Sequence, residues 1–130
     1  MLLLTYKSKY DFNELKIKLE SLMIKKGMKI FSVIDHTKNA SSVGMKINRS
    51  ILYIFGNPRN GTLLMIQDMR IGVILPLKLL IWENENKELQ ITYYPLYDIL
   101  KEFKLNDEGL AIAKNIDNNI IEMLKEIVVE

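Results

Sequence analysis

Polar side chains suited to chemistry follow or interrupt three apolar stretches of this chain. Asp35 and His36 come directly after the first stretch, a glycine-containing segment at 56–62 follows the second, and Lys78 lies inside the third. His36 is the single histidine, a residue type that can act as a general acid or base or as a metal ligand. Asp35 can cap the turn that follows. The simpler interpretation makes His36 an exposed or hydrogen-bonded residue at a strand end.

The segment that begins at Gly56 approaches the pattern of a phosphate-binding loop. Its two glycines have the required separation, but Thr62 follows the second glycine directly, without the lysine of that motif. Pro58 also removes a backbone N–H group. The pattern therefore argues against nucleotide hydrolysis of that type. It leaves anion binding at a helix N-terminus, with Asn57 as the cap and Arg59 nearby, or a plain turn between a strand and a helix.

Lys78 lies within an otherwise apolar strand. Burial would lower the pKa of its amine and allow it to act as a base or to form an imine, whereas a packed stem with its head in water would be purely structural. If the strands before His36 and Gly56 are parallel, the two loops emerge at one sheet edge, where open α/β sheets bind ligands. We therefore expect a cleft between the Asp35-His36 turn and the Gly56–Thr62 loop that binds a small anionic ligand. Its lining would be Asp35, His36, Asn57, Arg59, Thr62 and Lys78.

Three other functions remain open at this point. An enzyme would use His36 as its general acid or base and Lys78 as an electrostatic or covalent partner, which requires hydrogen-bond reach between them, directly or through one water. A haem or metal carrier would bind through His36, for instance across a dimer axis. A pure interaction module would use a helix or a hairpin to join subunits. The sequence identifies no cofactor.

The composition is that of one globular domain over residues 1–130, with 48% hydrophobic and 26% charged residues and no linker. The absence of cysteine excludes disulfides, thiolate zinc sites, iron–sulfur clusters and cysteine nucleophiles. A net charge of +2 argues against a dedicated nucleic-acid binder. The charge is uneven, at +7 over residues 22–80 and −6 over residues 81–130. This favours an anionic ligand near the middle segment or pairing between subunits, unless the acidic residues form only a solvated helix face.

We expect a cytoplasmic protein with no membrane association. The segment Met1 to Lys7 has no basic leader, and its apolar run is shorter than the roughly 7–15 residues of a signal-peptide core. The longest uncharged apolar run, Ile71 to Leu77, falls below the roughly 18 residues that span a bilayer.

Hydrophobic periodicity predicts the order β-α-β-(short α)-β-α-β-β-α-α. A crossover helix between the first two strands predicts that they are parallel neighbours, and the last two strands should form an antiparallel hairpin. The fold class is therefore α+β, with a mixed, roughly five-stranded sheet and helices packed on it. The strands are expected at 2–6, 28–34, 51–55, 77–83 and 88–94.

These segments resemble the family called domain of unknown function 302. The resemblance rests on three blocks that follow one another over nearly the whole chain: Ile34 to His36, Phe55 to Pro58 with Gly61-Thr62, and Leu75 to Lys78 with Trp82-Glu83. The chain departs from the family pattern at Arg49-Ser50 and at Met69 to Ile71. The resemblance implies a compact α+β domain and a homodimer, and it carries no established activity.

Overall fold

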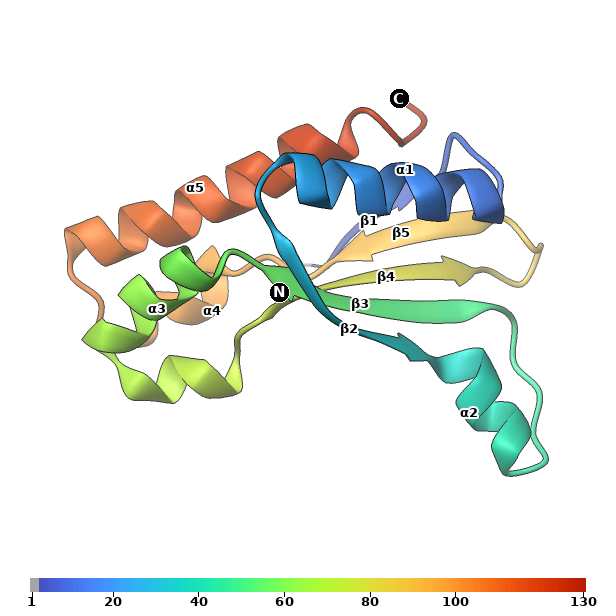
Figure 1. Ribbon diagram of the computed structural model, residues 1–130, viewed down its shortest axis with the longest axis horizontal. Helices are drawn as coiled ribbons and strands as arrows, with labels where there is room; N and C mark the ends of the chain where they lie inside the picture. Colours follow the sequence, from blue (N-terminus) through green and yellow to red (C-terminus); the bar gives the residue numbers. More distant parts are fainter. Residues whose placement is uncertain (1–2) are drawn as a thin grey trace.

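The computed structural model describes residues 3–130, and within that range it contains five strands, five α-helices and one 3-10 helix (Figure 1). The predicted order of elements is confirmed. The expected first strand begins at Leu4, and Leu2 lies outside the described residues. In chain order the elements are β1 (Leu4–Lys7), α1 (Phe12–Lys25), β2 (Lys29–Asp35), α2 (His36–Ser42), β3 (Ser50–Gly56), α3 (Pro58–Gln67), the 3-10 helix η1 (Met69–Val73), β4 (Leu77–Glu83), β5 (Leu89–Tyr93), α4 (Tyr97–Leu100) and α5 (Asp107–Leu124).

The five strands form one sheet in the order β1-β5-β4-β3-β2, and every neighbouring pair is antiparallel. The α+β class and the five strands are confirmed, but the expectation of a mixed sheet with β1 and β2 as parallel neighbours is wrong. The two strands do run in the same direction, as a crossover helix requires. However, α1 carries the chain across the full width of the sheet, and β3, β4 and β5 then fill the space between them.

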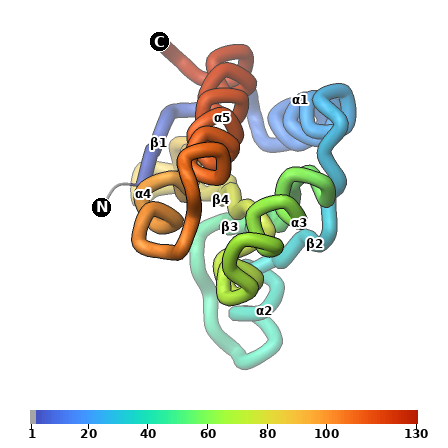
Figure 2. Tube along the Cα trace, turned by 90° about the vertical axis from the view of Figure 1, so that its left-hand side faces the viewer, coloured from blue at the N-terminus to red at the C-terminus, as the bar shows by residue number. Residues whose placement is uncertain are grey.

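The core lies between one face of the sheet and the helices α1 and α5 (Figures 1 and 2). Alternate residues of β3, β4 and β5 are buried on that face. Two buried tyrosines tie the helices to it: Tyr53 donates to Glu20 Oε2 of α1 at 2.6 Å, and Tyr93 donates to Asp117 Oδ1 of α5 at 2.8 Å. Each hydroxyl has a partner, so the aromatic rings are buried without an unsatisfied polar group.

The opposite face of the sheet carries apolar side chains that remain partly exposed. Leu52 and Ile54 of β3 alternate with buried residues, and Leu80 and Trp82 of β4 do the same. In the described part of the chain, α1 and α5 cover only the other face, while α2 lies near one end of β3 and α3 and η1 lie toward the other end (Figure 1). This leaves a half-exposed apolar surface on the sheet.

Local signals explain where the helices begin. Asp11 Oδ1 accepts from Glu14 N at 2.9 Å, and Asp35 Oδ1 accepts from Lys38 N at 2.9 Å. Asn57 caps α3 with Pro58 at the first helical position, as the sequence predicts. These caps confirm that the polar residues after the strands serve the helices that follow them.

Candidate functional site

The predicted cleft between the Asp35-His36 turn and the Gly56–Thr62 loop does not form. The register of β2 and β3 pairs Asp35 with Ile51 and Lys29 with Gly56. In an antiparallel pair the carboxyl ends of the two strands lie at opposite ends of the strand pair. The two loops are therefore separated by the length of a strand, roughly 20 Å. The expectation of a shared cleft depended on parallel strands and is wrong for that reason.

His36 and Lys78 also lie apart. Lys78 is paired with Ile54, whereas His36 follows Asp35, the partner of Ile51. The backbone positions of Asp35 and Lys78 are therefore offset by roughly 10 Å along the strands and by about 9.5 Å across two strand spacings, and His36 lies one residue beyond Asp35. His36 is the first residue of α2, and no group of three or more metal-ligating side chains occurs anywhere in residues 3–130. The structure does not assemble the acid-base pair.

Lys78 has a structural position at the start of β4. Its Nζ donates to the carbonyl oxygen of Ile74 at 2.7 Å and to that of Pro76 at 3.1 Å. Burial lowers the pKa of this amine. Because both acceptors belong to the segment between η1 and β4, Lys78 holds the backbone of that segment in place.

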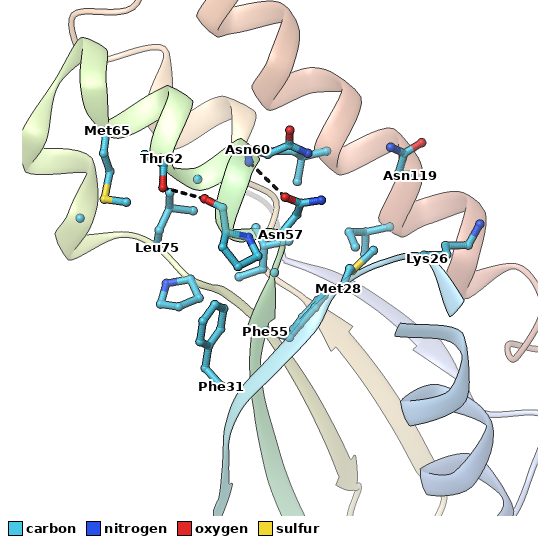
Figure 3. Close-up of a pocket in the computed structure, with 18 residues that line it drawn as sticks. Lys26, Met28, Phe31, Phe55, Asn57, Asn60, Thr62, Met65, Leu75 and Asn119 are labelled. Carbon is cyan, nitrogen blue, oxygen red and sulfur yellow. Dashed lines mark hydrogen bonds between the residues drawn. The ribbon is translucent and has the colours of Figure 1, made fainter. Parts of the chain in front are cut away.

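A pocket of about 510 Å³ opens beside α3, at the Gly56 end of β3 (Figure 3). Its walls come from the turn between α1 and β2, the start of β2, the first two turns of α3, the segment before β4, and α5. Most of its lining is apolar. The eighteen lining residues are Lys26, Met28, Phe31, Phe55, Gly56, Asn57, Pro58, Asn60, Gly61, Thr62, Met65, Gly72, Leu75, Pro76, Leu77, Ile116, Asn119 and Ile120.

Two of the six predicted site residues, Asn57 and Thr62, line this pocket. Arg59 belongs to α3 but is not part of the lining, and the remaining three lie elsewhere. Thr62 Oγ1 donates to the carbonyl oxygen of Pro58 at 2.7 Å, so its hydroxyl proton is engaged within the helix. Sequence reasoning therefore found the loop that forms one wall and missed the rest of the site.

The first turn of α3 has no free backbone donor for an anion. Asn57 Oδ1 accepts from the N–H groups of Arg59, at 2.9 Å, and Asn60, at 3.2 Å. The N–H of Gly61 donates to the carbonyl oxygen of Asn57 at 3.0 Å, and Pro58 has no N–H. A helix N-terminus binds anions through unpaired N–H groups. Here Asn57 already accepts hydrogen bonds from these groups, so they are not available to an anion.

The missed residues come from distant parts of the chain. Phe31 lies at a β-bulge between Ile30 and Ser32, and 43% of its surface is exposed. Asn119 and Ile116 reach the pocket from α5, about sixty positions after Asn57. The spacing of Ile116 and Ile120 puts both on one face of α5, but such spacing does not show which other elements that face meets.

The match to a family model covers residues 4–127. The chain belongs to the family described as Domain of unknown function DUF302. This confirms the resemblance seen in the three sequence blocks. A crystal structure of an uncharacterized conserved protein DUF302 from Bacillus stearothermophilus has the same fold, with a TM-score of 0.86, 18% identity, and coverage of 96% of this chain and 97% of that one.

Part of the DUF302 chain is also similar to part of longer proteins. It is 33% identical over 90 residues to proteins named Fluoride-specific ion channel FluC 1, from Brucella suis biovar 1 (strain 1330), and FluC 2, from Brucella melitensis biotype 1 (strain ATCC 23456 / CCUG 17765 / NCTC 10094 / 16M). The match covers 69% of this chain and 35% and 33% of those proteins, so the chain spans about a third of their length. Among the helices of residues 3–130, none has the length and apolar character needed to cross a membrane.

Proposed function

We propose that this DUF302 domain binds a small, largely apolar molecule in the pocket beside α3. The observation that carries the proposal is the pocket itself, with a volume of about 510 Å³, an apolar lining and a few polar side chains. Small-molecule sites in proteins have this size and this composition. The two lining methionines, Met28 and Met65, are flexible and can adapt to the shape of a ligand.

The lining favours binding over catalysis. Within the described residues, it includes no Asp, Glu, His, Ser, Tyr or Cys, and Lys26 is its one ionisable side chain. General acid-base and nucleophilic catalysis draw mostly on those absent residue types, and the hydroxyl of Thr62, which does line the pocket, donates to the carbonyl oxygen of Pro58. Asn57 and Thr62 keep their predicted place as ligand-binding residues in this proposal. Asp35, His36, Arg59 and Lys78 do not, because they lie outside the pocket.

The similarity to a third of the channel proteins supports a binding module that accompanies another unit. For this chain we propose ligand binding alone. A cytoplasmic location stays a prediction from the sequence.

Filling the pocket provides a direct test. The neutral fluorescent probe N-phenyl-1-naphthylamine should bind the native protein and brighten. Met65→Trp should lower the probe affinity by about tenfold or more, because the larger ring occupies the pocket next to Gly72. Ile66→Trp is the matched control, since Ile66 is the next residue of α3, is 72% exposed and does not line the pocket. Equal affinity in the two variants would disprove the proposal.

We also infer a homodimer that forms through the uncovered face of the sheet. The half-exposed side chains of Leu52, Ile54, Leu80 and Trp82 support it, because contiguous apolar patches of this kind mark interaction surfaces. Sedimentation velocity should show a dimer for the native chain and a monomer for Leu80→Glu. Ile17→Glu is the control, because Ile17 is 70% exposed on α1, and it should remain dimeric. A native monomer would refute the inference.

A further inference from the structure

We propose that the ligand of the pocket is an amphipathic monocarboxylate, held with its carboxylate at Lys26 and Asn119 and its apolar body against Phe31 and Leu75. This inference rests on the proposed function and adds to it the ligand class and the orientation. A saturated or aryl-substituted carboxylic acid has the required chemistry.

The lining separates into a polar end and an apolar end. Figure 3 shows Lys26 at the end of α1, Asn119 on α5 and the side-chain amide of Asn57 toward the same side of the pocket. Phe31 and Leu75 lie toward the other side (Figure 3). A ligand with one polar end and one apolar end matches this division, whereas a uniformly polar or uniformly apolar ligand leaves one end unsatisfied.

Charge decides which polar group fits. Lys26 makes no ion pair with any residue in the described range, and no carboxylate lines the pocket. An anionic head group therefore complements the lining, and a cationic one would meet uncompensated positive charge. The side chains have to supply the binding donors, because the first turn of α3 has none free.

Free amide donors complete the polar end. Asn57 uses its Oδ1 for the cap of α3, which leaves its Nδ2 available as a donor. Asn119 forms no side-chain hydrogen bond within residues 3–130, so its amide can also donate to a carboxylate oxygen. Two amides and one ammonium can satisfy the oxygens of one carboxylate.

The apolar end should report the length of the ligand. Each methylene buried in an apolar pocket raises the affinity by about fourfold, until the chain outgrows the space. We expect decanoate to bind about fifteenfold more tightly than octanoate, since it has two more methylenes, and decan-1-ol to bind more weakly than decanoate because it lacks the charge. Decyltrimethylammonium should bind most weakly of the three decyl compounds.

The test is displacement of N-phenyl-1-naphthylamine by these four compounds. Lys26→Met should lower the affinity for decanoate by about tenfold and leave the affinities for decan-1-ol and the probe unchanged. Lys25→Met is the control, because Lys25 is the exposed neighbouring residue outside the lining, and it should change none of these affinities. Asn119→Leu and its control Asn118→Leu form a second matched pair. Asn119→Leu should lower the affinity for decanoate, and Asn118→Leu should leave it unchanged because Asn118 does not line the pocket.

The outcomes separate the two proposals. Binding of the probe that Met65→Trp abolishes shows that the pocket is a binding site. If, in the same protein, decanoate binds no better than decan-1-ol, or Lys26→Met does not change the affinity for decanoate, the carboxylate inference is wrong. If the probe binding is insensitive to Met65→Trp, the proposed function itself fails.

Discussion

Asp117 should be the most sensitive polar residue of this fold. The residue is 7% exposed, and its carboxylate accepts three hydrogen bonds of 2.8 Å each, from the Tyr93 hydroxyl and from the N–H groups of Leu96 and Tyr97. It thereby joins α5 to the end of β5 and to the start of α4. Because α5 also forms one wall of the pocket, loss of these three hydrogen bonds should lower both the stability of the fold and the affinity of the pocket for its ligand.

The expected magnitude follows from those three bonds. A hydrogen bond to a charged group contributes about 1.5–3 kcal/mol, and its loss strands a buried donor. Removal of the buried charge and entry of water into the vacated space offset part of the cost. We therefore expect Asp117→Ala to lower the free energy of unfolding by about 3–5 kcal/mol.

Urea denaturation followed by circular dichroism measures this change. With a slope of about 2 kcal/mol per molar urea, the midpoint should fall by roughly 1.5–2.5 M. Tyr93→Phe removes one of the three bonds and should cost about 1.5–3 kcal/mol, which keeps the test readable if Asp117→Ala does not fold. Asn118→Ala, at the exposed neighbour, is the control. A midpoint for Asp117→Ala no lower than that of the control would refute the reasoning.

Three further predictions concern local interactions. The Arg70 guanidinium, bound to the Asp68 carboxylate at 2.7 Å, holds the pKa of Asp68 well below its usual range. The native carboxylate therefore stabilises the fold above a pH of about 4. Urea denaturation at several pH values should show that the native protein is more stable than Asp68→Asn above that pH. The difference in the free energy of unfolding should shrink as the pH falls below about 4. Constant advantage down to pH 2 or so would contradict it. Asn57→Ala should destabilise the protein by about 1 kcal/mol through loss of the α3 cap, against no change for Asn60→Ala in the same assay. Burial, aided by the hydrogen bond to Glu20, raises the pKa of Tyr53, so Tyr53 should not ionise near the ordinary tyrosine pKa of 10.0. In a spectrophotometric pH titration, Tyr53→Phe should therefore show the same tyrosinate absorbance change near pH 10.0 as the native protein. A smaller absorbance change in the variant would show that Tyr53 is open to solvent.

Much of the fold could be read from local patterns. Caps such as Asp35 and Asn57 act within three residues, so they are visible in the chain without knowledge of its neighbours. The hairpin of β4 and β5 is also local, and it forms as expected. The sheet order was not predictable in this way, because the connection through α1 is compatible with a neighbouring strand or with one at the far edge.

The candidate site depended on that undetermined order. Once β2 and β3 are antiparallel, His36 and Gly56 belong to opposite ends of the sheet, and the polar residues that looked like one site become two helix caps. The pocket instead collects Asn57 and Phe31 with residues of α5, which are remote in sequence.

The sequence by itself determined the elements and their caps, because hydrophobic period, helix capping and turn chemistry act over a few residues. It also indicated the family, through the resemblance of three residue blocks to the family pattern. Only the tertiary structure decided which loops meet, because strand pairing is set by packing of the whole sheet against α1 and α5. The location of the pocket, and the exclusion of His36 from it, follow from that packing alone.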